Sequence, residues 1–156
     1  MKLNILIIED DDEKLMKITY FVETTFIDSK VSSARSYASG LRKIISLKGT
    51  TDIILMDMSM PSFDIAEHEP GGGTPEHFAG RDLLAQMKLR KIYVPTVIVT
   101  MFDSFGEKGS EKSLNQLKNE LKCEYAPPFV GLVYYDSRQE GWQAELKLII
   151  QESRLS

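Results

Sequence analysis

The chain has 156 residues, of which 42% are hydrophobic and 27% charged, enough for one compact domain and too few for two ordinary ones. Its net charge of -4 creates no general field that attracts nucleic acid or an anionic membrane, so we expect no DNA binding by this chain alone and no membrane binding. Cys123 is the single cysteine and cannot form an internal disulfide. No apolar run approaches the roughly 20 residues of a membrane span, and the short run after Met1 ends in acids, unlike a signal peptide. We therefore expect a reducing, cytoplasmic location.

Short apolar runs alternate with segments of helical period, a pattern typical of a parallel sheet covered by helices. The predicted strands are 3–9, 29–34, 52–57, 95–100 and 129–135. The predicted helices are 13–26, 37–47, 80–90, 113–122 and a last helix that starts near 137. Five βα units predict an α/β fold of the flavodoxin-like, doubly wound kind, a single domain over 1–156 whose five-stranded parallel sheet has the order 2-1-3-4-5 and helices on both faces.

Apolar periodicity and capping residues predict the inward faces and the starts of these helices. The predicted N-terminal caps are Ser36 and two capping boxes, Ser113 with Gln116 and Ser137 with Glu140. The residues expected to face inward are Leu15, Ile18, Val22, Thr25, Ala38, Leu41, Ile44, Ile45, Leu114, Leu117, Leu121, Trp142, Leu146, Ile149 and Ile150.

Two connections are longer than this fold requires, at about 62–79 and 102–112. The first contains three consecutive glycines and few large apolar residues, so we expect it to be mobile. His68 and His77 lie in it among acidic residues, but their spacing matches no compact zinc motif, which favours a solvated loop.

Acidic residues follow the first and third predicted strands. Because these strands are neighbours in the expected order, Glu9, Asp10 and Asp11 should come close to Asp57 at the carboxyl edge of the sheet. Converging carboxylates repel one another, which raises a pKa or calls for a cation. Mg²⁺ is the cation that we expect here, because it prefers oxygen ligands. The backbone carbonyl of Ser59 is a further candidate oxygen ligand.

Thr100 ends the fourth strand, so its hydroxyl is expected to face the same cleft and to hydrogen-bond whatever group Asp57 carries. The stretches "ILIIEDDDEKL", "DIILMDMSMP" and "PTVIVT", in this order, resemble the receiver domain of two-component response regulators, and the resemblance runs over the whole chain. It implies that Asp57 accepts a phosphoryl group, that Glu9 and Asp10 bind the metal with Asp57 and the carbonyl of Ser59, that Thr100 is the switch hydroxyl and that Pro61 is the turn proline.

The same resemblance implies a phosphorelay. The donor would be a histidine kinase or a phosphotransfer protein, the cofactor Mg²⁺, and the output a change of shape read by a downstream protein partner. A receiver of this kind is a phosphoacceptor signalling domain with slow self-dephosphorylation at most, so we expect no independent enzymatic turnover.

One departure from the family concerns the end of the fifth strand, where the family has a lysine followed by proline. Here Tyr134 or Tyr135 stands in the place of the lysine and Asp136 near that of the proline. Loss of an ammonium beside the acidic cleft makes the phosphorylated state less favourable. Arg138 and Lys108 are candidate replacements. The alternative is a degenerate receiver that acts as a phosphorylation-independent interaction module through its inserted loops.

Two other classes fit the residues poorly. A flavodoxin needs a glycine-rich or hydroxyl-rich phosphate loop after the first strand, where this chain has consecutive acids that would repel a flavin phosphate. An aspartate-nucleophile phosphatase needs a second carboxylate two residues after the nucleophile, and Ser59 cannot act as an acid or base there.

Overall fold

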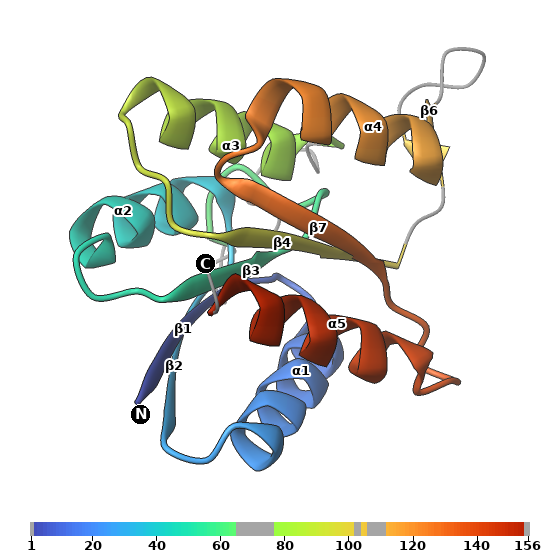
Figure 1. The fold of residues 1–156 in the computed structure, drawn as a ribbon. Coiled ribbons are helices and arrows are strands. Elements are labelled where there is room, and N and C mark those ends of the chain that lie inside the picture. Colours follow the sequence, from blue (N-terminus) through green and yellow to red (C-terminus); the bar gives the residue numbers. More distant parts are fainter. Residues whose placement is uncertain (1, 65–76, 102–103, 106–111, 155–156) are drawn as a thin grey trace.

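The computed structural model describes residues 2–64, 77–101, 104–105 and 112–154, which form one central sheet with helices on both faces (Figure 1). The five strands of the sheet are parallel and lie in the order β2-β1-β3-β4-β7. Their bounds are Leu3–Ile8 for β1, Ser29–Ala34 for β2, Ile53–Met56 for β3, Thr96–Thr100 for β4 and Phe129–Tyr134 for β7. The predicted fold class and strand order are confirmed.

The helices cover the two faces of the sheet in separate groups. Their bounds are Asp12–Thr25 for α1, Tyr37–Leu47 for α2, Ala79–Leu89 for α3, Leu114–Tyr125 for α4 and Gly141–Ser153 for α5. Figure 1 shows α1 and α5 on one face and α2, α3 and α4 on the other. Each face of the sheet is therefore buried, as is usual for a parallel sheet.

Two apolar cores fill the space between sheet and helices, one on each face. Leu6 and Ile8 of β1 point into the core shared with α2, α3 and α4. Ile5 and Ile7 point into the core shared with α1 and α5. Because side chains alternate along a strand, a strand buried on both faces reads as a continuous apolar run.

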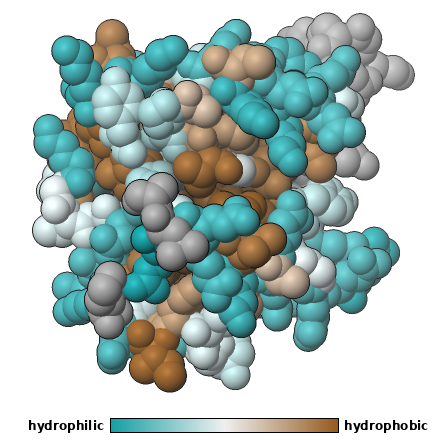
Figure 2. All heavy atoms as spheres, viewed as in Figure 1, coloured by the Kyte–Doolittle hydropathy of each residue, from teal (hydrophilic) through white to brown (hydrophobic). Residues whose placement is uncertain are grey.

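The outward faces of the helices are mostly hydrophilic, whereas hydrophobic residues reach the surface between the two helical layers (Figure 2). Val130 and Tyr134 of the edge strand β7 are exposed. In the part of the chain that the structure describes, no helix is both long and apolar enough to cross a bilayer.

Two of the three predicted helix caps are confirmed. Ser36 caps α2 and accepts a hydrogen bond from the backbone N–H of Ser39, and Ser113 and Gln116 form a capping box on α4. The predicted box of Ser137 with Glu140 is wrong, because α5 begins at Gly141 and Glu140 makes no side-chain cap.

Asp136 explains the later start of α5. Its side chain accepts a hydrogen bond from the backbone N–H of Arg138, and its carbonyl accepts one from Gln139. The segment therefore forms a turn, and the helix starts beyond it.

The buried face of α1 differs from the predicted one. Ile18 and Val22 are buried as expected, but Phe21 and Lys14 are buried with them, whereas Leu15 and Thr25 are only partly covered. In α2, Ile45 is exposed rather than inward, and Ile44 is the residue that reaches the core. The remaining residues expected to face inward are buried or partly buried: Ala38, Leu41, Leu114, Leu117, Leu121, Trp142, Leu146, Ile149 and Ile150.

A short antiparallel pair of strands, β5 (Ser104–Phe105) and β6 (Lys112–Ser113), lies in the second predicted insertion. Sequence analysis missed it, because strands of two residues are too short to show a period. The first insertion falls largely on 65–76, which lies outside the described residues, and so do the prediction of mobility there and His68. His77 is described and exposed.

Candidate functional site at the carboxyl edge of the sheet

Asp57 directly follows β3 and is almost fully buried, with 2% of its surface exposed. Its backbone N–H donates to the carbonyl of Ile8, the last residue of β1, at 3.1 Å. Its Oδ1 accepts a hydrogen bond from the backbone N–H of Met58 at 2.7 Å. The carboxylate is therefore held in one orientation at the carboxyl edge of the sheet, where ligands bind in open α/β folds.

Glu9 and Asp10 meet Asp57 at this edge, as predicted. One carboxylate oxygen from each of these residues lies within 4.8 Å of those of the other two. Glu9 is buried and Asp10 half-buried.

Asp11 does not belong to this cluster, which corrects the prediction that it lies close to Asp57. Its Oδ1 accepts a hydrogen bond from the backbone N–H of Lys14 at 3.0 Å, so it is the N-cap of α1. A capping aspartate turns its oxygen toward the free N–H groups of its own helix, and this draws it away from the carboxylates.

Lys14 places a buried ammonium among the carboxylates, a feature that the sequence analysis missed. Its Nζ lies 2.6 Å from Glu9 Oε2 and 3.2 Å from Asp57 Oδ2. The same Nζ donates a hydrogen bond to the carbonyl of Val99, in β4, at 2.6 Å. The three N–H groups of the ammonium thus meet three acceptors, the condition under which a lysine that is only 1% exposed can be accommodated.

The position of Lys14 in the first turn of α1 explains its reach. Side chains of a helix tilt toward its N-terminus, and the N-terminus of α1 lies directly after β1 and its acids. The lysine side chain therefore returns toward the carboxyl edge of the sheet.

Tyr135, the residue after β7, packs beside this ammonium. Its ring centroid lies 5.8 Å from Lys14 Nζ, within cation–π range, and 5.0 Å from the ring centroid of Trp142. Trp142 also packs edge-to-face on Phe21 of α1, with 5.3 Å between ring centroids. Tyr135 is 3% exposed and Tyr134 is 41% exposed, so of the two tyrosines it is Tyr135 that adjoins the site.

Of the two candidate replacements for the missing lysine, the structure describes Arg138 alone. The prediction that Arg138 reaches in is wrong, because its guanidinium is exposed and hydrogen-bonds the carboxylate of Asp136. A charged carboxylate two residues away satisfies it in solvent. Lys108 lies outside the described residues.

Burial dominates the electrostatics of the cluster. It raises the pKa of Glu9, and the charge of Asp57 raises it further, whereas the ammonium of Lys14 lowers it and favours the carboxylate. Burial also raises the pKa of Asp10. For Lys14, burial alone would lower the pKa, but the carboxylates of Asp57 and Glu9 outweigh it and the pKa is raised. The lysine therefore remains an ammonium at neutral pH.

The donor set fits a hard divalent cation. The cluster offers carboxylate oxygens from three residues, against a single ammonium in contact with it in the described part of the chain. Half-buried Asp10 adjoins solvent, so a hydrated cation has a path to the cluster. Ser59 is half-buried between the buried Met58 and Met60.

Thr100 is fully buried at the end of β4, the strand next to β3. Its carbonyl accepts a hydrogen bond from the backbone N–H of Tyr135 at 2.7 Å, which joins the end of β4 to the residue after β7. The predicted hydrogen bond of its hydroxyl to a group on Asp57 stays a prediction, as does metal binding by the carbonyl of Ser59.

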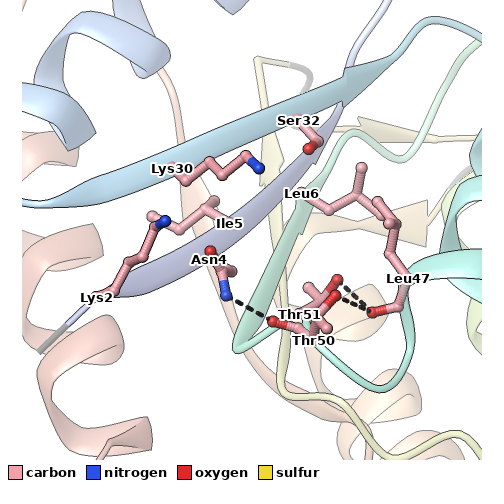
Figure 3. A pocket seen from close by; sticks show the side chains of 9 residues that line it. All are labelled: Lys2, Asn4, Ile5, Leu6, Lys30, Ser32, Leu47, Thr50 and Thr51. Carbon is pink, nitrogen blue, oxygen red and sulfur yellow. Dashed lines mark hydrogen bonds between the residues drawn. The ribbon is translucent and has the colours of Figure 1, made fainter.

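A different hollow lies at the opposite end of the sheet, at the amino ends of β1 and β2 (Figure 3). Its polar groups largely bind one another: Asn4 Nδ2 donates to the carbonyl of Thr50, and the hydroxyls of Thr50 and Thr51 donate to that of Leu47. Lys2 and Lys30 are surface side chains at its rim, and none of its lining residues is acidic. The carboxyl edge, with its buried charges, remains the candidate site.

Comparison with known proteins identifies the family. No family model matches the chain. The Detocs response regulatory protein DtcB of Enterobacter cloacae is 32% identical over 144 residues, which cover 92% of this chain and 95% of that protein. The chain belongs to the response regulators. An uncharacterised protein of Sinorhizobium fredii, y4jR, is 28% identical over 142 residues, covering 91% of this chain and 93% of that protein.

Solved receiver domains share the fold of this response regulator. The response regulator domain of Thermotoga maritima CheB matches with a TM-score of 0.65 and 17% identity, covering 100% of this chain and 98% of the other. A receiver domain protein of Clostridium thermocellum matches with a TM-score of 0.64 and 19% identity, covering 98% of each chain. Chemotaxis response regulator CheY4 of Vibrio cholerae matches with a TM-score of 0.63 and 15% identity, covering 96% of this chain and 99% of the other. The receiver fold inferred from the strand-end motifs is confirmed.

Proposed function

We propose that this receiver accepts a phosphoryl group on Asp57 from a phosphohistidine of a histidine kinase or phosphotransfer protein, and that the resulting change of shape is read by a downstream protein partner. The observation that carries the proposal is the fixed, buried carboxylate of Asp57 among the carboxylates of Glu9 and Asp10 and the ammonium of Lys14. Such a concentration of buried charge is costly for a fold and is typical of functional sites.

The transfer is a nucleophilic displacement at phosphorus. Met58 holds Oδ1 of Asp57 through its backbone N–H, so Oδ2 is the oxygen that we expect to attack. The bond between Oδ2 and phosphorus forms while the bond between phosphorus and the donor's imidazole nitrogen breaks. The bonding pair stays on that nitrogen, and the ring takes up one proton to leave as neutral imidazole. The product is an acyl phosphate on Asp57.

The same proposal includes magnesium. Glu9, Asp10, Asp57 and the backbone carbonyl of Ser59 would hold the ion, whose chemistry is to offset the negative charge that a carboxylate and a phosphoryl group bring together.

Thr100 would bind a phosphoryl oxygen through its hydroxyl and so report phosphorylation to the rest of the fold. The backbone hydrogen bond from Tyr135 to the carbonyl of Thr100 supports this part of the proposal, because it ties the end of β4 to the segment between β7 and α5. A shift of Thr100 would therefore be felt at the surface formed by α4, β7 and α5.

Intact-mass analysis after incubation with acetyl phosphate and Mg²⁺ tests the proposal. We expect the mass of one phosphoryl group to be added to the unaltered protein, and no addition to Asp57→Asn. Asp12→Asn is the matched control, because Asp12 is an acid of the same stretch whose side chain is 81% exposed and pairs with Arg35. An unmodified protein under conditions that phosphorylate a second receiver would contradict the proposal.

A second candidate function is a degenerate receiver that binds partners without phosphate. The ion pairs of Lys14 favour it, because the ammonium already compensates the charges of Asp57 and Glu9. If the protein takes up no phosphoryl group from acetyl phosphate or from phosphohistidine donors, this interaction module becomes the better account.

A further inference from the structure

We propose that Lys14 of α1 is the phosphoryl-binding cation of this receiver, in place of the lysine that the family has at the end of its last strand. The inference rests on the proposed phosphorylation of Asp57. It assigns a charge-stabilising contact to a residue of α1 for which the family resemblance gives no role.

The geometry around Asp57 supports this assignment. Lys14 Nζ lies 3.2 Å from Oδ2, the oxygen that the backbone N–H of Met58 leaves available. A phosphoryl group carried on Oδ2 therefore begins next to the ammonium. The bond from Nζ to the carbonyl of Val99 anchors the lysine from the neighbouring strand, so its ion pairs can be exchanged for a phosphoryl oxygen while the anchor remains.

The position at which the family has its lysine holds no cation in this chain. The position after β7 holds Tyr135, whose ring is buried against Trp142 and lies beside Lys14 Nζ. Arg138, the next cation along the chain, points to Asp136 in solvent. Within the described ranges, Lys14 is the cation that the structure places in contact with Asp57.

Lys14 takes part in the transfer through its charge alone. The bond between Oδ2 and phosphorus forms, the bond between phosphorus and the imidazole nitrogen breaks, and the electron pair leaves with that nitrogen. Lys14 forms no covalent bond and keeps its proton. Its positive charge faces the non-bridging oxygens, which carry the negative charge of the acyl phosphate.

A purely structural Lys14, which only neutralises Glu9 and Asp57, makes different predictions. It would be needed for folding, but it would not contact the phosphoryl group or set the rate of transfer. The two possibilities are separated by measurements on the phosphoryl group itself.

The first experiment compares Lys14→Gln with Lys17→Gln. Lys17 lies one turn away on α1, is 44% exposed and pairs with Glu13, so it is a matched control outside the site. We expect the rate of phosphorylation by acetyl phosphate and the affinity for beryllofluoride to fall roughly 10- to 100-fold in Lys14→Gln, the effect of one hydrogen bond to a charged group. Both should stay within about twofold of the unaltered protein in Lys17→Gln.

A relocated lysine provides the rescue. In the double variant Lys14→Gln with Tyr135→Lys, an ammonium is placed directly after β7, at the tyrosine that adjoins the site, and we expect part of the lost rate to be recovered. A lysine needed only to neutralise Glu9 in place would not be replaced in this way.

A measurement on the unaltered protein covers the case in which Lys14→Gln does not fold. The Nζ resonance of Lys14 in ¹⁵N-lysine-labelled protein should shift when beryllofluoride binds, and that of Lys17 should not. An unmoved Lys14 resonance in a protein that does bind beryllofluoride overturns the inference, as does a Lys14→Gln variant phosphorylated at the rate of Lys17→Gln; in both cases the proposed function stands. If the unaltered protein accepts neither phosphoryl group nor beryllofluoride, the proposed function fails and this inference with it.

Discussion

Gly80, in the first turn of α3, packs its Cα directly against the backbone of Asp57. A Cβ at this position would lie 2.5 Å from the carbonyl oxygen of Asp57 and 3.0 Å from the Cα of Met58. The backbone N–H of Gly80 also donates to the carbonyl of Met58 at 2.9 Å. The start of α3 is thus seated on the segment that carries the candidate phosphoacceptor, and there is no room for a side chain between them.

Gly80→Ala should therefore destabilise the protein. Neither contacting group is a flexible side chain, so the backbone itself must move, and overpacking of this kind costs about 1–3 kcal/mol. Urea unfolding followed by circular dichroism measures the loss. Gly141→Ala, at the start of α5, is the control, because a Cβ there meets nothing within 4 Å and alanine favours a helix. Equal free energies of unfolding in the two variants would show that α3 can move away from Asp57 without loss of stability.

The strand-end acids and the order of the strands were predictable for a clear physical reason. β1 and β3 are buried on both faces, so they read as unbroken apolar runs, and a carboxylate at the end of such a run has to lie at the edge of the sheet. The meeting of Glu9 and Asp10 with Asp57 follows from strand order alone.

The burial of Lys14 did not follow from the sequence. A lysine in the first turn of a helix reads as a solvated residue, and its burial depends on acceptors from β1, β3 and β4. One of these acceptors, the carbonyl of Val99, is 85 residues away in the chain. Periodicity within one helix carries no information about such distant partners. One indirect signal was present in the sequence, the absence of the family's lysine after the last strand, which raised the question of a replacement without pointing to α1.

A turn at Asp136 explains the wrong cap of α5. Ser137 and Glu140 have the spacing of a capping box, but Asp136 accepts a hydrogen bond from the backbone N–H of Arg138 with its side chain and one from Gln139 with its carbonyl. Ser137 therefore lies inside a turn, and the helix begins beyond it at Gly141. The spacing of a motif alone does not show whether a turn precedes the helix.

A pH-dependent contribution to stability is expected from Glu120 of α4, which pairs with Arg81 of α3 and with Lys112 of β6. The hydrogen bond from Lys112 holds the pKa of Glu120 below its ordinary value of 4.5, although partial burial opposes this. A lowered pKa means that the contribution is present above about pH 4.5 and is lost as the pH falls through the folded-state value.

Glu120→Gln should accordingly lower the free energy of unfolding at pH 7 by about 1 kcal/mol or less, since the ion pair is partly exposed. The difference between the two proteins should shrink as the pH falls below the pKa of Glu120 in the unfolded chain. Urea titrations of both proteins across this pH range provide the measurement. Glu145→Gln, at an exposed position of α5, should leave stability unchanged throughout. A difference that grows toward acid pH would contradict the assigned sign.

Ser39 of α2 joins the start of that helix to the segment after β3. Its Oγ accepts a hydrogen bond from the backbone N–H of Ser36 at 3.1 Å and donates one to Asp64 Oδ1 at 2.7 Å. Ser39→Ala removes both, so we expect a loss of about 1–2 kcal/mol in the free energy of unfolding. Thermal and urea unfolding check the value. Ser46→Ala, at the exposed end of the same helix, should cost much less, and an equal loss in both variants would assign the effect to the helix rather than to the contact with Asp64.

The last prediction concerns magnesium and the separate parts that the carboxylates have in holding it. Glu9 Oε1 accepts a hydrogen bond from the backbone N–H of Asp11, and Oε2 pairs with Lys14, so both of its oxygens are already engaged. Asp10 is half-buried and adjoins solvent, which makes it the carboxylate best placed to receive a hydrated ion.

Asp10→Asn should weaken Mg²⁺ binding by about tenfold or more, because loss of even an outer partner of a metal site costs about 10- to 100-fold in affinity. In the unaltered protein, a Mg²⁺ titration followed by NMR should move the amide signals of residues 9–11 and 57–59. Asp12→Asn is the control, since the exposed side chain of Asp12 pairs with Arg35 rather than joining the cluster. Equal affinities of the two variants would remove Asp10 from the metal site. Amide signals that stay fixed at millimolar Mg²⁺ would mean that the ammonium of Lys14 already provides the compensating charge, and that the cluster does not take a divalent ion without a phosphoryl group.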